Sequence, residues 1–495
     1  MVASDLREWI DLLRREDELV EVDAEVDPFL EVTEIVDRTV KGGGPALLFR
    51  RPKGSRHPLL VNQFGTERRM ALAFGESSLD AVGRKLEDVF ELQPPQGLVE
   101  KVKGLGKLKK LADSMPRRVG GRAPCQEVVL EPDLNLLPIQ HCWPGDPAPF
   151  ITLPAVITRD PRTGARNVGM YRMQKIDART TFMHWQVHKD GRADWLASGE
   201  RLEVAVALGL DPVTAYSASA PLPKHIDEFM LAGFLRGAPV ELAPGRTVDL
   251  EVPANAEIVL EGYVQRDDVG VEGPFGDHTG YYSPPEPFPV FHLTAMTMRR
   301  NAVYPSIVVG VPPQEDAWLG KATERIFLPA IRMTVPEIVD YDLPVAGAFH
   351  NCAIVSIRKV FPGHARKVMH AIWGLGMLSL TKAVVVVDEF VDVHYYGEVF
   401  FHVGANVDPK RDVVVSEGPL DQLDHAAASY CFGGKLGIDA THKWTEEGGR
   451  DWPERIRMTP EVRELVDRRW AEYGIGPKQE QNGRISRGLR EKLRL

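Results

Sequence analysis

The sequence lacks the features of several specialised classes of protein. Its 495 residues include only four cysteines, which are far apart and form no CxxC pair, so a disulfide scaffold is excluded. No apolar run approaches the roughly 20 residues that a membrane-spanning helix needs. The N-terminus is charged and amphipathic, unlike a secretory signal. We therefore expect a reduced, cytoplasmic protein.

The sequence also lacks an excess of positive charge and the common catalytic signatures. Lys and Arg number 60 against 70 for Asp and Glu, a formal net charge of −10, which argues against a nucleic-acid-binding protein. No GxGxxG follows a predicted strand, and GxxxxGK[ST], HExxH and GxSxG do not occur. The basic stretch over residues 99–122 is interpreted as a solvated helix leading into a linker, with a membrane-surface patch as the alternative.

The patterns that are present change along the chain. Residues 1–122 alternate amphipathic helical patterns with short strands, which indicates an α/β region ending in the basic linker. Residues 123–312 contain short apolar runs separated by Pro, Gly and Asp, which predicts a β-rich, barrel-like domain. Residues 313–457 alternate strands with helices, which predicts a βαβ crossover and a parallel sheet. Residues 458–495 contain a terminal helix and a polar tail.

The stretch VEGPFGDHTGYY contains two carboxylates, and its glycines and proline predict a loop or a strand–turn junction rather than a helix. Glu272 and Asp277 lie five residues apart among glycines and a proline, and His278 directly follows Asp277. A cation such as Arg172 between them would lower the pKa of one acid, while the other, in drier surroundings, kept its proton near neutral pH. Such a divided pair suits general acid–base catalysis. The alternative is that the two carboxylates cap turns and Arg172 is a surface cation.

A second dense stretch, NVGMYRMQKIDARTTFMHWQVHKDG, is predicted to form strand, turn and strand. It would bring Asn167 near His188, and a predicted helix would add the carboxylate of Glu228. This mixed set of nitrogen and oxygen atoms suits Mn²⁺ or Mg²⁺ better than zinc. The alternative is that each of these side chains is a satisfied structural group.

Several long blocks of the sequence resemble the UbiD-type decarboxylases, which use prenylated FMN. The blocks, which span roughly residues 5–475, include NVGMYRMQ, HWQVHKDG, DEFMLAGFLRG, EGPFGDHTGYY, PPQEDAWLGKATERIFLPAI, HNCAIVSIRK and GIDATHKW. The resemblance implies a carboxy-lyase of mixed α/β and β fold. It would have an N-terminal α/β region, a central FMN-binding split-β-barrel-like domain, and a C-terminal α/β domain with a terminal oligomerisation helix.

The resemblance also implies roles for individual residues. An Mn²⁺ ion, often accompanied by K⁺, would hold the cofactor phosphate, and its ligands would be Asn167, His188 and Glu228. The catalytic set would be Arg172, Glu272 and Asp277, with the last as proton donor. The cofactor-contacting residues would be Met170, Tyr171, Arg172, His184, Trp185, Gln186, His188, Lys189 and Lys382. Decarboxylation leaves negative charge on carbon, and the cofactor would supply the electron sink that side chains lack.

Within the family, the C-terminal blocks are closer to the menaquinone (futalosine pathway) decarboxylases than to the ubiquinone-pathway enzyme. His184 and Asn406 stand where the ubiquinone-type enzyme has Arg, and His278 resembles the phenolic-acid branch. These differences favour 1,4-dihydroxy-6-naphthoate, prenylated or not, as the substrate. The alternatives are 4-hydroxy-3-polyprenylbenzoate or another phenolic acid and, from a different class, a non-catalytic flavin-binding protein.

The resemblance implies partners as well. A flavin prenyltransferase would supply the cofactor, and a prenylated substrate would favour peripheral association with a membrane. The family forms homodimers or homohexamers, and the predicted helix around residues 462–473 is a candidate for packing between subunits.

Overall fold

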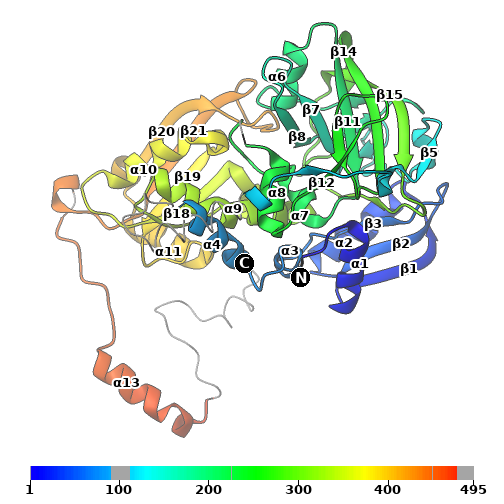
Figure 1. The fold of residues 1–495 in the computed structure, drawn as a ribbon. Helices are drawn as coiled ribbons and strands as arrows, with labels where there is room; N and C mark the ends of the chain where they lie inside the picture. The colour runs from blue at the N-terminus through cyan, green and yellow to red at the C-terminus, as the bar shows by residue number, and fades with distance from the viewer. Residues whose placement is uncertain (1, 91–111, 225, 449, 476–495) are drawn as a thin grey trace, which may run out of the picture. The chain divides into compact units, whose positions relative to one another are not determined.

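The computed structural model describes residues 2–90, 112–224, 226–448 and 450–475. The chain divides into two compact units (Figure 1). Unit 1 consists of Met1–Ala330 and Gln422–Ala426, and unit 2 consists of Ile331–Asp421 and Ala427–Leu495. The division falls inside one helix, α9 (Glu315–Thr334).

The N-terminal part of unit 1 is a small α/β layer. Its four strands form a sheet in the order β1-β2-β3-β16. Asp5 caps helix α1 by accepting a hydrogen bond from the Glu8 amide, and the apolar face of α1 packs against this sheet. The elements of this layer are α1 (Leu6–Arg15), β1 (Leu19–Val26), α2 (Glu31–Lys41), β2 (Ala46–Pro52), β3 (Leu59–Val61), α3 (Glu67–Ala73), α4 (Leu79–Phe90) and β16 (Tyr304–Pro305).

A nine-stranded antiparallel sheet forms the centre of unit 1. Its order is β6-β9-β10-β15-β14-β11-β7-β8, and β5 pairs with β15. Successive side chains of a strand point to opposite faces, so in β11 Ala205 belongs to one apolar cluster and Val206 to the other. The strands are β5 (Val128–Leu130), β6 (Phe150–Ile151), β7 (Ala155–Arg159), β8 (Arg166–Met170), β9 (Met173–Lys175), β10 (Thr180–Met183), β11 (Arg201–Leu208), β14 (Ile258–Glu272) and β15 (Glu286–Met298).

Further helices and a small sheet belong to the described part of unit 1. The side chain of Asp227 caps helix α8 at its N-terminus, and Gly237 ends it in the left-handed conformation that glycine adopts without strain. The small sheet has the order β13-β12-β4. The elements are β4 (Arg117–Arg118), α6 (Asp190–Ala197), α7 (Pro212–Ser217), α8 (Glu228–Arg236), β12 (Glu241–Pro244) and β13 (Glu251–Pro253).

Unit 2 is built on a five-stranded sheet with the order β17-β18-β19-β21-β20. Strands β18, β19 and β21 are parallel, and α10 connects β18 to β19, which is the predicted βαβ crossover. The antiparallel strands β17 and β20 form the two edges. The elements are β17 (Ile338–Asp342), β18 (Cys352–Ile357), α10 (His364–Trp373), β19 (Ala383–Asp388), α11 (Tyr396–Asn406), α12 (Pro409–Asp412), β20 (Val413–Pro419), β21 (Phe432–Asp439) and α13 (Pro460–Arg469).

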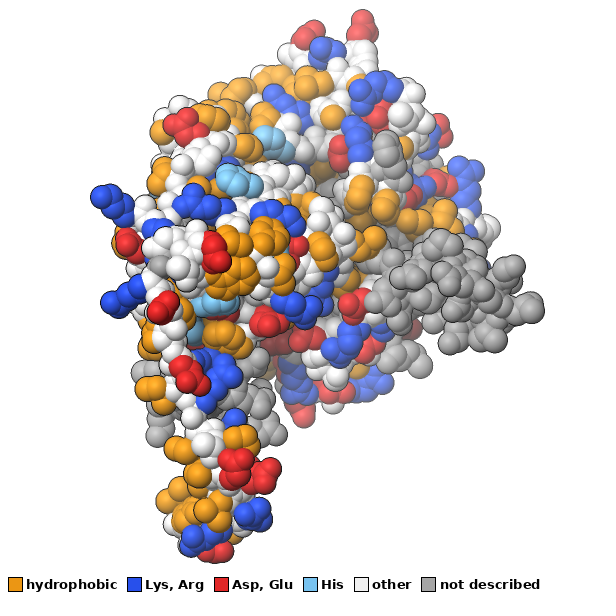
Figure 2. All heavy atoms as spheres, turned by 90° about the vertical axis from the view of Figure 1, so that its left-hand side faces the viewer, with side chains coloured by type: hydrophobic (Ala, Val, Ile, Leu, Met, Phe, Trp, Pro, Cys, Tyr) orange, Lys and Arg blue, Asp and Glu red, His pale blue; other side chains and the backbone are white. Residues whose placement is uncertain are grey.

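The last described α-helix, α13, buries none of its residues. Apolar side chains of this segment, including Val462 and Leu465, lie at the surface (Figure 2). Among the described residues, no helix combines the length and the apolar character needed to cross a membrane. The sequence predicted a division into four parts, with boundaries at residues 122, 312 and 457. The two compact units do not test this division, which stays a prediction.

Candidate active site

The centre of the candidate site is the side chain of Arg172, which follows the end of β8. Its Nε and Nη2 atoms donate to the two carboxylate oxygens of Glu272 at 2.8 and 3.2 Å, and Nη1 donates to Asp277. Nη2 also donates to the Ser283 hydroxyl at 3.2 Å. All of these side chains belong to unit 1. The structure thus brings the three predicted catalytic residues into one contact, which we call the triad.

The triad is buried, and its charges shift the pKa of both acids in the same direction. Burial alone raises the pKa of Glu272, but the charge of Arg172 and the hydrogen bond from His184 outweigh it and bring the pKa to about 2. For Asp277 too burial raises the pKa, and hydrogen bonds from His278 together with the charge of Arg172 bring it below its usual range.

The expectation that one of the two acids is ionised and the other protonated is therefore wrong for this structure. We expected one carboxylate near Arg172 and one protonated in drier surroundings. A single guanidinium reaches both Glu272 and Asp277 instead, and Asp277 also accepts from the backbone amide of His278 at 2.7 Å. Both acids are ionised at neutral pH, and the triad carries one net negative charge.

His184 forms part of the same cluster. Its Nδ1 lies 2.9 Å from the Glu272 carboxylate, and because an ionised carboxylate only accepts, Nδ1 carries the proton. Burial and the charge of Arg172 lower the pKa of His184, so the imidazole is neutral. Its Nε2 is buried and has no hydrogen-bond partner within the described part of the chain. A ligand that donates a hydrogen bond there would satisfy this atom.

The loop that carries Asp277 is held by residues that the sequence analysis missed. Asp146 accepts from the Gly276 amide at 2.9 Å and from the Trp143 amide at 2.9 Å. The Trp143 ring packs so closely on Gly276 that a Cβ there would lie 2.2 Å from it. Gln174 accepts from the Gly273 amide at 2.7 Å. The available signal was the turn sequence WPGD, in which a carboxylate follows a Pro-Gly pair.

A separate cavity of about 360 Å³ contains two of the three predicted metal ligands, Asn167 of β8 and Glu228 of α8. The Glu228 carboxylate accepts from the Val168 amide at 3.0 Å, which ties α8 to β8. The other lining residues are Asp160, Arg162, Thr163, Ala165, Arg166, Asp190, Asp194 and Lys224. The third predicted ligand, His188, is exposed and precedes the lining residue Asp190 by two positions.

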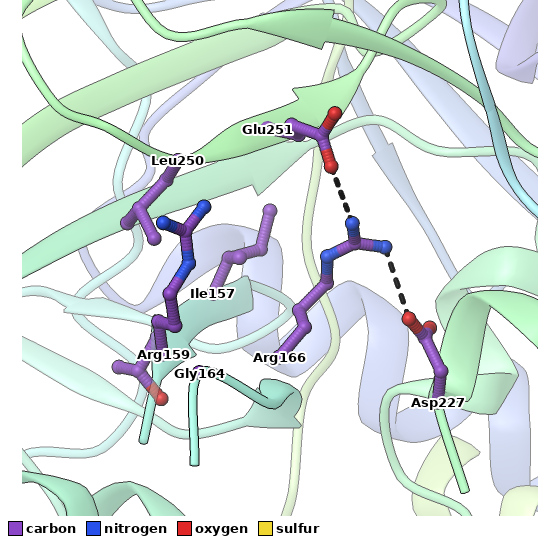
Figure 3. Close-up of a pocket in the computed structure, with 8 residues that line it drawn as sticks. Ile157, Arg159, Gly164, Arg166, Asp227, Leu250 and Glu251 are labelled. Atoms are coloured by element: carbon purple, nitrogen blue, oxygen red, sulfur yellow. Dashed lines mark hydrogen bonds and ion pairs between the residues drawn. The ribbon is translucent and has the colours of Figure 1, made fainter. Parts of the chain in front are cut away.

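An ion pair joins the two elements that carry these ligands. Arg166 donates to Asp227 at 3.0 Å and to Glu251 at 2.5 Å, inside a neighbouring cavity of about 400 Å³ (Figure 3). Arg166 directly precedes Asn167, and Asp227 directly precedes Glu228. The ion pair therefore joins β8 to α8 through the residues that directly precede the two predicted ligands.

The predicted cofactor contacts differ in how accessible they are. Tyr171 and Trp185 are buried in an apolar cluster and meet edge to face at 6.4 Å. Met170 is half-buried and lines a narrow cavity that also includes Leu153 and Leu210. Gln186 and Lys189 are half-buried in the turn before α6.

Two residues singled out from the sequence belong to unit 2. Lys382 directly precedes β19, and its amide donates to the Asn351 carbonyl at 3.0 Å. Asn406 ends α11 and donates to the Ala440 carbonyl at 2.9 Å.

Models of three domains of one carboxy-lyase match the chain in order. They are the N-terminal domain of 3-octaprenyl-4-hydroxybenzoate carboxy-lyase over residues 10–88, its Rift-related domain over residues 117–312, and its C-terminal domain over residues 317–440. The chain belongs to the UbiD family. It is therefore a carboxy-lyase, and the family resemblance found in the sequence is confirmed.

Three further proteins match along almost the whole chain. Proteins from Archaeoglobus fulgidus and Aquifex aeolicus, described only as uncharacterized, are 55% and 50% identical over 95% of this chain and 99% of their own. The UbiD-class enzyme HmfF from Pelotomaculum thermopropionicum, in complex with FMN, is 30% identical over 94% of this chain and 99% of its own, with a TM-score of 0.77.

A second relative with a solved structure confirms the fold class. Vanillic acid decarboxylase from Sedimentibacter hydroxybenzoicus, in its closed form, is 26% identical over 96% of this chain and 100% of its own, with a TM-score of 0.84. The mixed α/β and β fold with several domains, predicted from the sequence, is shared with these UbiD enzymes.

Asn167 and Glu228, which line one cavity, offer ligand atoms that fit a divalent cation. Amide and carboxylate oxygens are ligands that Mn²⁺ and Mg²⁺ prefer. Burial raises the pKa of Glu228 to about 8, and the contacts that oppose this are the backbone amides of Glu228 and Val168. A cation in the cavity would offset the burial and keep this carboxylate ionised.

Proposed function

We propose that this UbiD enzyme catalyses the non-oxidative decarboxylation of an aromatic acid with prenylated FMN as its cofactor. The observation that carries the proposal is the buried guanidinium of Arg172, which holds Glu272 and Asp277 together. HmfF, whose structures contain FMN in one case and prFMN in an evolved dimeric form, supports the choice of cofactor.

In this proposal Arg172 orients the substrate and Asp277 supplies a proton. A guanidinium binds a carboxylate through two parallel hydrogen bonds, so an incoming substrate carboxylate competes with the two acids for Arg172. The added negative charge raises the pKa of Asp277, which takes up a proton. Asp277 then transfers this proton to the substrate carbon from which CO₂ has left. When bound, prenylated FMN supplies the electron sink for the reaction.

The roles of Glu272 and His184 follow from their charges. Glu272 keeps its negative charge, because its pKa is about 2, and it holds Arg172 in place through two hydrogen bonds. His184 donates to Glu272 and stays neutral, so it adds no positive charge that would compete with Arg172 for the substrate.

The proposed enzyme would bind Mn²⁺, together with K⁺, and these ions would help to hold the cofactor phosphate. Asn167 and Glu228 share one cavity, which supports them as ligands. His188 is proposed as the third ligand on the family resemblance. The proposed cofactor contacts are Met170, Tyr171, Arg172, His184, Trp185, Gln186, His188, Lys189 and Lys382.

The proposed substrate is 1,4-dihydroxy-6-naphthoate or its prenylated form, which places the enzyme in menaquinone biosynthesis. The support is the resemblance of the C-terminal blocks, with His184 and Asn406 in place of Arg. A second candidate is a phenolic acid such as 4-hydroxy-3-polyprenylbenzoate. It is favoured by His278 beside Asp277 and by the similarity to a vanillic acid decarboxylase.

We also propose that the enzyme is a homodimer or homohexamer that receives its cofactor from a flavin prenyltransferase. Helix α13, with apolar side chains at its surface and none buried, is the proposed contact between subunits. A prenylated substrate would bring the enzyme to a membrane surface during turnover.

The experiment that tests the proposed function is CO₂ release by anaerobically reconstituted enzyme. Prenylated 1,4-dihydroxy-6-naphthoate, the unprenylated acid and prenylated 4-hydroxybenzoate are offered side by side. We expect preference for a naphthoate. Preference for the benzoate would favour the second candidate, and release from none of the three acids would contradict the proposal.

A further inference from the structure

Asn167, one of the two proposed cation ligands that line the cavity of about 360 Å³, can bind a cation in only one orientation of its side-chain amide. The side-chain amide of Asn167 has an oxygen that can bind a cation and an NH₂ group that cannot, and the two ends are nearly equal in size. A cation site that uses this residue therefore requires a neighbour that distinguishes the two ends. The structure contains such a neighbour on the adjacent strand.

Thr158 of β7 is paired in register with Asn167 of β8. Asn167 Nδ2 donates to the Thr158 hydroxyl oxygen at 3.0 Å. The same hydroxyl donates to a carboxylate oxygen of Asp194, in α6, at 2.7 Å. Thr158 and Asp194 are both buried, with 0% and 1% of their surface exposed, so water does not compete for these hydrogen bonds.

The direction of the two hydrogen bonds, from Asn167 to Thr158 and from Thr158 to Asp194, follows from the number of protons available. A hydroxyl has a single proton to donate, and the Thr158 hydroxyl donates it to Asp194. The Thr158 oxygen is then left as an acceptor, and only the NH₂ end of Asn167 can donate to it. The Asn167 oxygen must face away from Thr158. Asn167, Asp194 and Glu228 all line the same cavity.

We propose that Thr158 and Asp194 are positioning residues that hold Asn167 with its oxygen available to the cation. The inference rests on the proposed function, because it takes Asn167 and Glu228 as cation ligands. Glu228 is held separately, through the Val168 amide. Partners behind the ligands typically change metal affinity by about 10- to 100-fold when they are removed.

The test measures Mn²⁺ binding directly. The full-length protein, saturated with FMN, is titrated with Mn²⁺, and the free ion is followed by its EPR signal. In Thr158→Val the hydroxyl is lost and the shape is kept, so the amide can turn over, and we expect the apparent Kd for Mn²⁺ to rise about 10- to 100-fold. Thr158→Ser restores the hydroxyl and should bind Mn²⁺ nearly as tightly as the unmodified protein.

A matched control is Thr297→Val, which makes the same change at another buried strand position. The Thr297 hydroxyl has no hydrogen-bond partner within the described part of the chain, so we expect unchanged Mn²⁺ binding. Thermal unfolding of all variants separates a loss of affinity from a loss of folding. If Thr158→Val binds Mn²⁺ as tightly as the unmodified protein, or if Thr158→Ser is as weak as Thr158→Val, the positioning role is wrong.

Two further variants separate this inference from the proposed cation site. Asn167→Ala and Glu228→Gln remove the ligands themselves, and both should abolish tight Mn²⁺ binding. If both variants bind Mn²⁺ normally, the cation site is wrong, and the positioning inference falls with it. If both lose binding while Thr158→Val keeps it, the cation site stands and the positioning role alone is refuted.

Discussion

Replacing Glu272 by Gln should destabilise the ligand-free protein by an amount that depends on pH. The carboxylate is fully buried and accepts two hydrogen bonds from Arg172. Its pKa is lowered from an ordinary 4.5 to about 2, which corresponds to about 3 kcal/mol of stabilisation at neutral pH. Removing one partner of a buried ion pair typically costs about 3–5 kcal/mol, a range that begins at this estimate.

The sign of the pH dependence follows from the lowered pKa. The stabilisation by Glu272 is complete above about pH 4.5, where the carboxylate is ionised even in the unfolded chain, and it is lost as pH falls towards 2. The free energy of unfolding in urea is measured for the unmodified protein and for Glu272→Gln at pH 7, 4.5 and 3. The difference between the two proteins should be about 3 kcal/mol at pH 7 and should shrink at pH 3.

Glu34→Gln is the matched control for this measurement. Glu34 pairs with Arg38 on the exposed surface of α2, and such a pair contributes about 0.3–0.5 kcal/mol. If Glu272→Gln costs no more than Glu34→Gln at pH 7, the buried carboxylate does not stabilise the protein as expected. An equal cost of Glu272→Gln at pH 7 and pH 3 would contradict a lowered pKa of Glu272.

Two further predictions concern catalysis and the cation. Asp277→Asn should retain FMN and Mn²⁺ but lower kcat for CO₂ release by about 10²- to 10⁴-fold, because the proposed proton donor is gone; near-normal turnover would remove Asp277 from that role. His188→Ala should weaken retention of Mn²⁺ and of the cofactor together, as measured by metal analysis and flavin absorbance of the purified protein. Full retention of both would show that His188 is not a ligand.

Much of the fold follows from local patterns in the sequence. The apolar run KAVVVV predicted a buried parallel strand, and it forms β19 between β18 and β21. Pairing between distant segments has no such local signal. Strand β16 joins the sheet of β1 to β3 from more than two hundred residues away, and Gln422–Ala426 belongs to unit 1 although its neighbours in sequence belong to unit 2.

The candidate site shows the same limit. Residue type and family resemblance were enough to select Arg172, Glu272 and Asp277. The sequence could not show that one guanidinium reaches both acids, and for that reason the expected division of their pKa values was wrong. Thr158 and Asp194 were missed because their relation to Asn167 depends on strand register and on a helix more than twenty residues further along the chain.

Strand β8 links the two halves of the proposed site. Asn167 lies within β8, and Arg172 follows its end at Met170. The pairing of Thr158 with Asn167 and of Ala155 with Met170 fixes the register of β8 on β7. A slip of one residue would turn every β8 side chain to the opposite face, which would remove Asn167 from the cavity and displace Arg172 from its two carboxylates. The proposed cation site and the triad therefore depend on a single strand pairing, and a change that weakens it should impair both.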